Sequence, residues 1–164
     1  MLRFAPVHYL TPRGFFRRAV ELALASSSLS LAGVSFVHWQ RAYRRIIDNP
    51  AAAIDKAKAL ALQCLEIDPS EPQGHWALGR AFLLLQDLSG WIDELRTVVS
   101  VNPNSVMSLY PLARSLTFAG ELEQSTSVVR EARSLSPFDP ILFATTSLDA
   151  MNHSMLGAMR KRPA

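Results

Sequence analysis

Residues 66–82 read EIDPSEPQGHWALGRAF, a proline-marked boundary followed by an amphipathic run. The boundary recurs, because Pro69, Pro103 and Pro137 each separate two apolar runs and stand 34 residues apart. Proline cannot continue a helix, and it disfavours helix in the residue before it. A period of this length indicates stacked structural units. The stretch therefore predicts a chain divided into short antiparallel helices that repeat in pairs.

Alignment on the prolines brings a second column into agreement. HWALGRAF (75–82) falls over LYPLARSL (109–116) and over FATTSLDA (143–150), and one column holds a small residue each time: Gly79, Ala113 and Ser147. Small residues let neighbouring helices pack closely. Glycine inside a helix is unfavourable by about 0.5–1 kcal/mol relative to alanine, so Gly79 indicates a packing constraint.

The pattern predicts an all-α fold. Gly120 is typical of a helix end, and Pro72 and Pro140 are typical of a first helical turn. No segment shows convincing strand alternation. We expect helices at about 14–25, 29–45, 50–66, 71–86, 90–101, 105–118, 121–135 and 139–156.

The repeated motif resembles the tetratricopeptide repeat (TPR) pattern W-x2-L-G-x2-Y…A-x3-F…P. The matching positions are Leu78, Gly79, Phe82, Leu95 and Pro103, and the next unit keeps Leu112, Ala132 and Pro137. An earlier unit, LSLAGVSFVHW, places Gly33 at the small position; it is about ten residues too long, and the loop RRIIDNPAA holds the excess. The resemblance implies an α-solenoid of antiparallel helix pairs, with about three repeats plus flanking helices. It covers residues 26–156, between an N-terminal basic segment at 1–25, which includes a helix or partial repeat, and a basic tail at 157–164.

A narrower resemblance rests on LAGVSFVHW, EIDPSEPQGHWALGRAF, VNPNS and SLSPFDPILFA. These phrases look like the C-terminal TPR region of bacterial class III adenylate cyclases and winged-helix transcriptional regulators. In those proteins the repeats are thought to mediate regulation or assembly. The sequence contains no pattern for the catalytic or DNA-binding domain, so the resemblance implies a repeat region standing alone, as a fragment, a split gene or an independent adaptor.

The charge is unevenly distributed. Residues 1–49 carry a net +5, residues 50–156 a net −5, and residues 157–164 a net +3. Because a nucleic-acid reader concentrates positive charge on its folded face, we expect no nucleic-acid partner. The uncharged run 22–37 is short and contains five serines, which favours a packed helix pair over a membrane span. We expect no membrane partner and a cytoplasmic protein; the alternative is targeting or anchoring through the N-terminal segment.

The TPR register also implies a binding groove. Trp76 and Arg80 fall at positions that line the concave face in TPR proteins, and Tyr110 and Arg114 occupy the same positions 34 residues later. Each pair is spaced i, i+4, so its side chains share a face. Aromatic and arginine side chains are enriched in binding hot spots, and arginine binds carboxylates with two hydrogen bonds. The alternative is internal, with each arginine stacked on its neighbouring aromatic ring. Further groove candidates are Met107, Phe118, Leu84 and Leu148.

Nothing in the sequence predicts catalysis. The four histidines are scattered and none stands at metal-ligand spacing from another. His75 takes the place of a core aromatic residue, and Cys64 occupies a small core column where an inert thiol is the ordinary state. There is no glycine-rich phosphate loop and no nucleophile motif. We therefore expect no enzyme activity, no cofactor and no metal.

Three functions are consistent with these features. The first is a protein–protein interaction module that binds a peptide or partner domain in a concave helical groove. The second is a regulatory subunit that controls an enzyme, such as a cyclase domain, on another chain. The third is a self-assembling module, in which the unpaired helix 139–156 docks on a copy, so that a homo-oligomer forms.

Overall fold

The computed structural model describes residues 27–137 and 142–160, and within them the chain forms seven helices and no strand. The predicted helix at 14–25 and Pro140 lie outside the described residues. The helices are α2 (Ser28–Tyr43), α3 (Pro50–Ile67), α4 (Pro72–Leu84), α5 (Leu88–Val101), α6 (Val106–Ala119), α7 (Leu122–Leu135) and α8 (Leu142–Arg160). The predicted all-α repeat fold is confirmed.

The helix boundaries follow the local sequence. The repeating prolines come two residues after the ends of α3, α5 and α7, and Pro72 begins α4, where its missing amide hydrogen is not needed. The Asp87 carboxylate accepts a hydrogen bond from the backbone N–H of Gly90 and so caps α5. Gly120 ends α6 with φ +80°, a left-handed conformation that glycine adopts readily.

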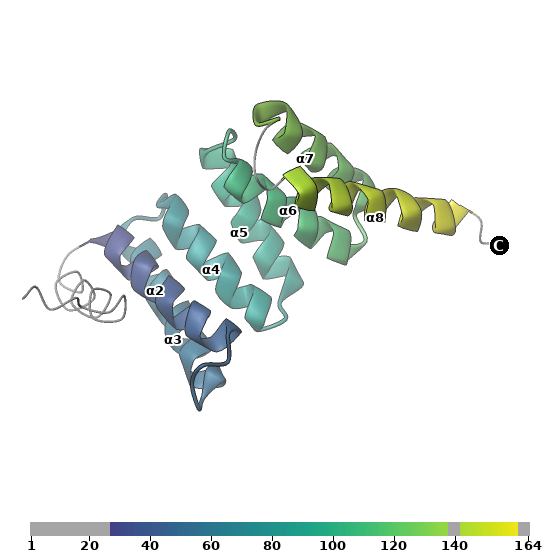
Figure 1. Ribbon diagram of the computed structural model, residues 1–164. Helices are drawn as coiled ribbons and strands as arrows, with labels where there is room; N and C mark the ends of the chain where they lie inside the picture. Colours follow the sequence, from purple (N-terminus) through teal and green to yellow (C-terminus); the bar gives the residue numbers. More distant parts are fainter. Residues whose placement is uncertain (1–26, 138–141, 161–164) are drawn as a thin grey trace, which may run out of the picture.

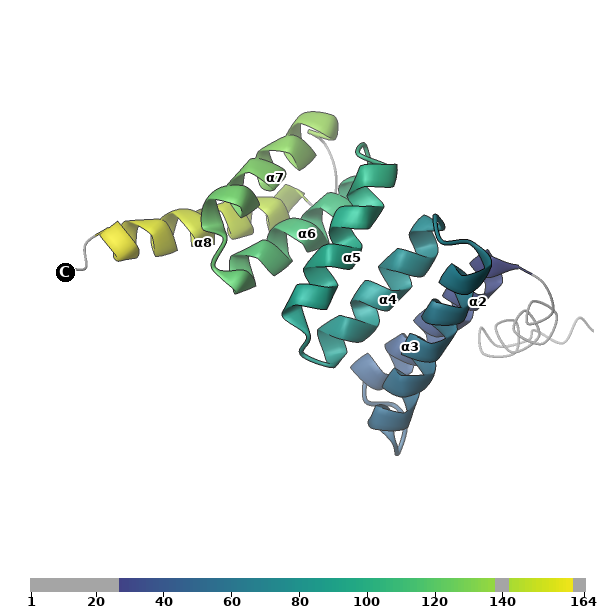
Figure 2. The ribbon, with the colours of Figure 1, turned by 180° about the vertical axis from the view of Figure 1, so that it is seen from behind.

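The helices form three antiparallel pairs that stack in chain order, α2 with α3, α4 with α5 and α6 with α7. Figure 1 shows the array running from the α2–α3 pair at one end to α8 at the other, and Figure 2 shows the same order from behind. α8 packs against both α7 and α6, as the first helix of a further pair would. This arrangement is an α-solenoid, in which each unit contacts mainly its neighbours.

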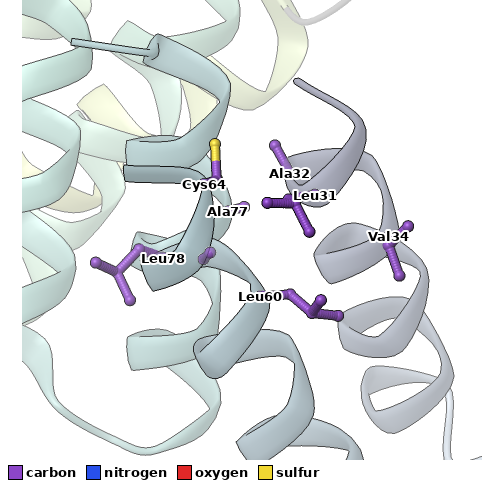
Figure 3. Close-up of a cluster of buried hydrophobic side chains, with 8 residues drawn as sticks. Leu31, Ala32, Val34, Leu60, Cys64, Ala77 and Leu78 are labelled. Carbon is purple, nitrogen blue, oxygen red and sulfur yellow. The ribbon is translucent and has the colours of Figure 1, made fainter. Parts of the chain in front are cut away.

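Apolar side chains from successive helices fill the space between the units. The first cluster joins α2, α3 and α4 (Figure 3) and consists of Leu31, Ala32, Val34, Leu60, Ala61, Cys64, Ala77 and Leu78. A second cluster, around Trp91, Leu95 and Leu116, joins α5 and α6. Because every cluster spans more than one unit, the core is continuous along the array rather than confined to one pair.

Glycines in α4 mark two close helix contacts. A Cβ atom on Gly79 would lie 3.2 Å from Glu94 Cβ and 3.5 Å from Trp91 Cδ1, both on α5. A Cβ on Gly74 would lie 2.8 Å from Cys64 Sγ on α3. The packing constraint predicted for Gly79 is thus present, and Gly74 imposes a second one that the repeat pattern did not indicate.

The assignment of Gly33 to the small position of the first unit is wrong. Gly33 is exposed, and no atom lies within 4 Å of the place of its Cβ. Ser35 is instead fully buried and donates a hydrogen bond from its hydroxyl to the carbonyl of Ala57 on α3, at 2.7 Å. The third unit has a hydrogen bond at the equivalent pair of positions with the direction reversed, because Ser125 on α7 donates from its hydroxyl to the carbonyl of Ala113 on α6, also at 2.7 Å. The first unit is therefore two residues out of the predicted register.

The docking of α8 depends on polar contacts as well as apolar ones. Asn152 is fully buried and accepts a hydrogen bond from Thr117 on α6, while its amide donates to Ser125 on α7, both at 2.8 Å. Arg133 on α7 pairs with Asp149 at 3.0 Å. The helix also continues to Arg160, so the first residues of the predicted tail 157–164 are helical.

The two contrasting glycines give a direct test of the close contact. Gly79→Leu would overpack the α4–α5 contact, and we expect the free energy of unfolding to fall by about 2–3 kcal/mol. Gly33→Leu places the same side chain on an exposed helix face, and we expect it to be neutral or to stabilise by up to about 1 kcal/mol. Urea unfolding followed by circular dichroism measures both. Equal effects of the two substitutions would contradict the contact.

Candidate functional site

A cavity of about 310 Å³ lies between α2, α4, α5 and α6. Its lining residues are Trp39, Tyr43, Trp76, Arg80, Leu83, Trp91, Leu95, Met107, Tyr110, Pro111 and Arg114. All three tryptophans of the chain belong to this wall. The cavity is at the small end of the volume range for ligand pockets.

Arg80 lies among aromatic rings at one side of the cavity. Its guanidinium carbon is 3.5 Å from the ring centre of Trp76, 4.4 Å from that of Trp39 and 4.9 Å from that of Phe36. Tyr43 extends this group of rings, because it stacks on Trp39 with the two ring centres 4.9 Å apart. We call Phe36, Trp39, Tyr43 and Trp76 the aromatic cluster.

The aromatic cluster changes the electrostatic setting of Arg80. Burial lowers its pKa to about 10, so the side chain still carries its charge at neutral pH. The faces of the rings attract the cation, and this attraction opposes the loss of hydration. Within the part of the chain that the structure describes, Arg80 has no carboxylate partner.

Five of the eight predicted groove residues line this one cavity: Trp76, Arg80, Met107, Tyr110 and Arg114. Trp76 and Arg80 come from α4, and the other three come from α6. Met107 is 57% exposed and Arg114 is exposed, whereas Trp76, Arg80 and Tyr110 are partly buried. The 34-residue register thus places equivalent positions of two successive units along one wall.

The other three candidates lie elsewhere. Leu148 is only 6% exposed and packs with Ala113 and Val129 in the core, because α8 turns this side chain toward α6 and α7. Leu84 does not line the cavity, and its neighbour Leu83 does, since one residue changes the helix face by about 100°. Phe118 is exposed and lies under the Arg114 guanidinium at 5.4 Å, outside the cavity wall.

The two predicted aromatic–arginine pairs therefore differ. Arg80 stacks on Trp76, as the internal alternative required, and it also lines the cavity. Arg114 lies over Phe118 and remains exposed. Binding and internal stacking are thus not exclusive, because a stacked guanidinium still has its edge N–H groups free to donate.

The sequence did not indicate the contribution of α2 to the wall. Phe36, Trp39 and Tyr43 follow one another at helical spacing, which was a usable signal for one aromatic face. With Ser35 at the small position, Phe36 is equivalent to Arg80 and Arg114, because each follows the small residue of its unit directly. The predicted register, with Gly33 at the small position, did not indicate this equivalence, because it is shifted by two residues from the observed one. Pro111 was also missed; it lies inside α6 and has no amide hydrogen to donate to the carbonyl of Met107.

His75 and Cys64 have structural surroundings. The His75 ring lies 2.7 Å from the Glu94 carboxylate and 2.9 Å from the carbonyl oxygen of Pro69, and so connects α4 to α5 and to the preceding turn. Cys64 is fully buried, and burial raises the pKa of its thiol, with the charge of Glu71 adding to the effect. Both observations favour packing roles for these residues.

The described residues form neither a metal site nor a membrane-spanning helix. No group of three or more His, Cys, Asp or Glu side chains is placed to hold a metal ion in residues 27–137 and 142–160. None of the helices over the same residues has the length and apolar character needed to cross a membrane. The expected cytoplasmic location stays a prediction.

Comparison with solved structures identifies the fold. MamA from AMB-1 is 17% identical over 89% of this chain and 76% of its own, with a TM-score of 0.67. The TPR2B domain of yeast Sti1, in a complex with pHsp70, is 12% identical over 76% of this chain and 98% of its own, with a TM-score of 0.63. The first TPR domain of Spaghetti (RPAP3), bound to the HSP90 peptide SRMEEVD, is 13% identical over 77% and 95%, with a TM-score of 0.60.

No protein-family model matches the sequence, and no curated protein matches it either. At these identities the likeness to solved structures shows the fold alone, which is a TPR-like helical solenoid. The narrower resemblance to the repeat regions of adenylate cyclases and winged-helix regulators stays a prediction.

The aromatic cluster gives a prediction for stability. Arg80→Ala removes a side chain that packs against three rings, and we expect the free energy of unfolding to fall by about 1–2 kcal/mol. Arg114→Ala removes an exposed side chain, and we expect a change within about 0.5 kcal/mol. Tryptophan emission during urea unfolding reports both, because all three tryptophans line the cavity. A similar, small effect of both substitutions would contradict the stacked arrangement.

Proposed function

We propose that this chain is a protein-interaction module that binds a peptide or an exposed segment of a partner protein in the groove formed by α2, α4 and α6. The observation that carries the proposal is the cavity between α2, α4, α5 and α6, where equivalent residues of successive units gather around two arginines. Tryptophan, tyrosine and arginine are the residues most enriched in binding hot spots. Partly exposed apolar side chains such as Met107 add contact area that becomes buried only in a complex.

The fold supports the same proposal by analogy. Of the proteins of similar structure, the first TPR domain of Spaghetti (RPAP3) is bound to the HSP90 peptide SRMEEVD, and the TPR2B domain of Sti1 is in a complex with pHsp70. Each of these proteins shares only its architecture with this chain. The chemistry of a partner is therefore inferred from the residues that line the cavity. Control of an enzyme on another chain, which the narrower resemblance suggests, is one form that this binding takes.

Self-association through α8 is a second candidate, supported by a specific surface. Phe143, Met151 and Met155 are 75%, 39% and 40% exposed and recur at helical spacing along α8. The buried residues Thr145, Leu148 and Asn152 mark the face of α8 that packs on α6 and α7, and the exposed methionines Met151 and Met155 lie beside this face. In each of the preceding pairs the first helix is covered by a second one, whereas α8 has no such cover within the described residues.

Capture of partners from a cell lysate tests the groove. The double variant Met107→Ser/Arg114→Glu alters two exposed residues of the cavity, so we expect normal folding and loss of captured partners. The control Leu62→Ser/Arg130→Glu makes the same changes at exposed residues that do not line the cavity. We expect the control to capture the same partners as the unaltered chain. Equal capture by the two double variants would exclude the groove.

Light scattering over a range of concentrations tests the α8 surface. If α8 packs on a second copy, the unaltered chain forms a dimer, and Met151→Glu returns it to the monomer mass, because a charge in an apolar interface is strongly unfavourable. Leu62→Glu places the same charge on an exposed residue of α3 and leaves the dimer intact. A constant monomer mass for the unaltered chain rules out this second candidate and leaves the groove proposal unaffected.

A further inference from the structure

The cavity of the proposed groove has an unbalanced charge. Its two ionised lining residues, Arg80 and Arg114, are both cations, and no aspartate or glutamate lines it. The other wall residues are aromatic or aliphatic, apart from the hydroxyl groups of Tyr43 and Tyr110. The indole N–H of Trp39 is buried without an acceptor in the described part of the chain, and the wall has no anionic acceptor.

The nearby carboxylates are engaged elsewhere. Glu94 contacts His75 at 2.7 Å, Glu121 contacts Arg96 at 3.3 Å, and Asp87 caps α5. Within residues 27–137 and 142–160, Arg114 is also without a carboxylate partner. An incoming anion therefore displaces no existing ion pair of these two arginines.

Arg80 is held in a way that favours a planar anion. Trp76 and Trp39 cover its guanidinium at 3.5 and 4.4 Å, which restricts the side chain before any ligand binds. A restricted side chain loses less conformational freedom on binding. Its fork of N–H groups matches the two oxygens of a carboxylate, and the apolar surroundings strengthen the attraction. The apolar part of the wall, with Leu83, Met107 and Pro111, suits a large apolar side chain beside that carboxylate.

We infer that the groove recognises an acidic peptide segment in which an aspartate or glutamate directly adjoins a large apolar or aromatic residue. This inference rests on the proposed function and names its ligand class. The carboxylate pairs with Arg80 or Arg114, and the adjoining side chain enters the cavity next to Met107 and Tyr110.

A single-stranded nucleic acid is the competing anion, because such ligands combine phosphate contacts with bases stacked on aromatic rings. The cavity offers two cations rather than a basic track along a backbone. The ring of Trp39 is already stacked between Phe36 and Tyr43, and Arg80 covers Trp76, so these rings have little free face for a base. The arrangement therefore favours a peptide.

The test uses three synthetic heptapeptides that share a central phenylalanine. Both residues next to the phenylalanine are aspartate in the first peptide, asparagine in the second and lysine in the third. Binding is followed by the indole N–H signals of the three tryptophans in nuclear magnetic resonance spectra, up to millimolar peptide. We expect the aspartate peptide to bind at least about tenfold more tightly than the asparagine peptide, and the lysine peptide to bind more weakly still.

Two variants locate the interaction. Arg80→Lys keeps the charge but loses the planar fork of N–H groups, and we expect it to lower the affinity for the aspartate peptide by about fivefold or more. The circular dichroism spectrum of this variant should remain that of the folded chain. Arg114→Gln alters an exposed residue, and we expect it to reduce the preference for aspartate over asparagine. Arg130→Gln, at an exposed residue that does not line the cavity, is the matched control. We expect it to change neither the affinity for the aspartate peptide nor the preference for aspartate over asparagine.

Several outcomes overturn the inference. One is equal affinity for the aspartate and asparagine peptides, which contradicts the acidic ligand but leaves a peptide groove in place. Another is tighter binding of a single-stranded thymidine octanucleotide than of the aspartate peptide. A third is the absence of any shift of the indole signals at millimolar peptide. The proposed function fails separately, in the capture experiment, if the cavity variant retains its partners.

Discussion

The structure depends on close contact between the two helices of each pair at one small residue. Gly79, Ala113 and Ser35 occupy this position in α4, α6 and α2, and the last two are fully buried. With a larger side chain there, the helices would separate and the rows of leucine and alanine behind them would lose contact. The position recurs in each pair, 34 residues apart between Gly79 and Ala113 and ten residues more between Ser35 and Gly79, because the first unit is longer. One local requirement, repeated, thus orients the pairs in the same way and generates the solenoid.

That same requirement positions the groove. Phe36, Arg80 and Arg114 directly follow the small residue of their units and so fall at equivalent places, and the two arginines line the cavity. Arg80 then lies against Phe36 and Trp39 of the preceding unit, at 4.9 and 4.4 Å. The contact joins two units from the groove side, while the first apolar cluster joins them from within. The packing of the helices and the lining of the cavity therefore follow the same register.

The sequence predicted the parts of the molecule that obey the period. The helices α3 to α7 and four residues of the cavity, Trp76, Arg80, Tyr110 and Arg114, follow directly from the 34-residue spacing. The first unit was misaligned because the small residues Gly33 and Ser35 both lie near the expected position, and only packing distinguishes them. The hydrogen bonds of Asn152 with Thr117 and Ser125 could not be predicted, since they depend on how α8 crosses α6 and α7. Leu148 was misassigned for the same reason, because it contacts the core that this crossing creates.

Two opposing effects act on Arg80 in the unliganded chain. Burial disfavours its charge and lowers its pKa to about 10, whereas the aromatic rings attract the cation. A carboxylate placed against the guanidinium would add a counter-ion to a group that is already partly desolvated. The free-energy cost of desolvating Arg80 on binding would therefore be smaller. The rings that stabilise the fold around Arg80 thereby also prepare it for an anion. An alanine at this position would remove both the stacking and the binding group, whereas lysine separates them, because it keeps the charge and loses the planar geometry.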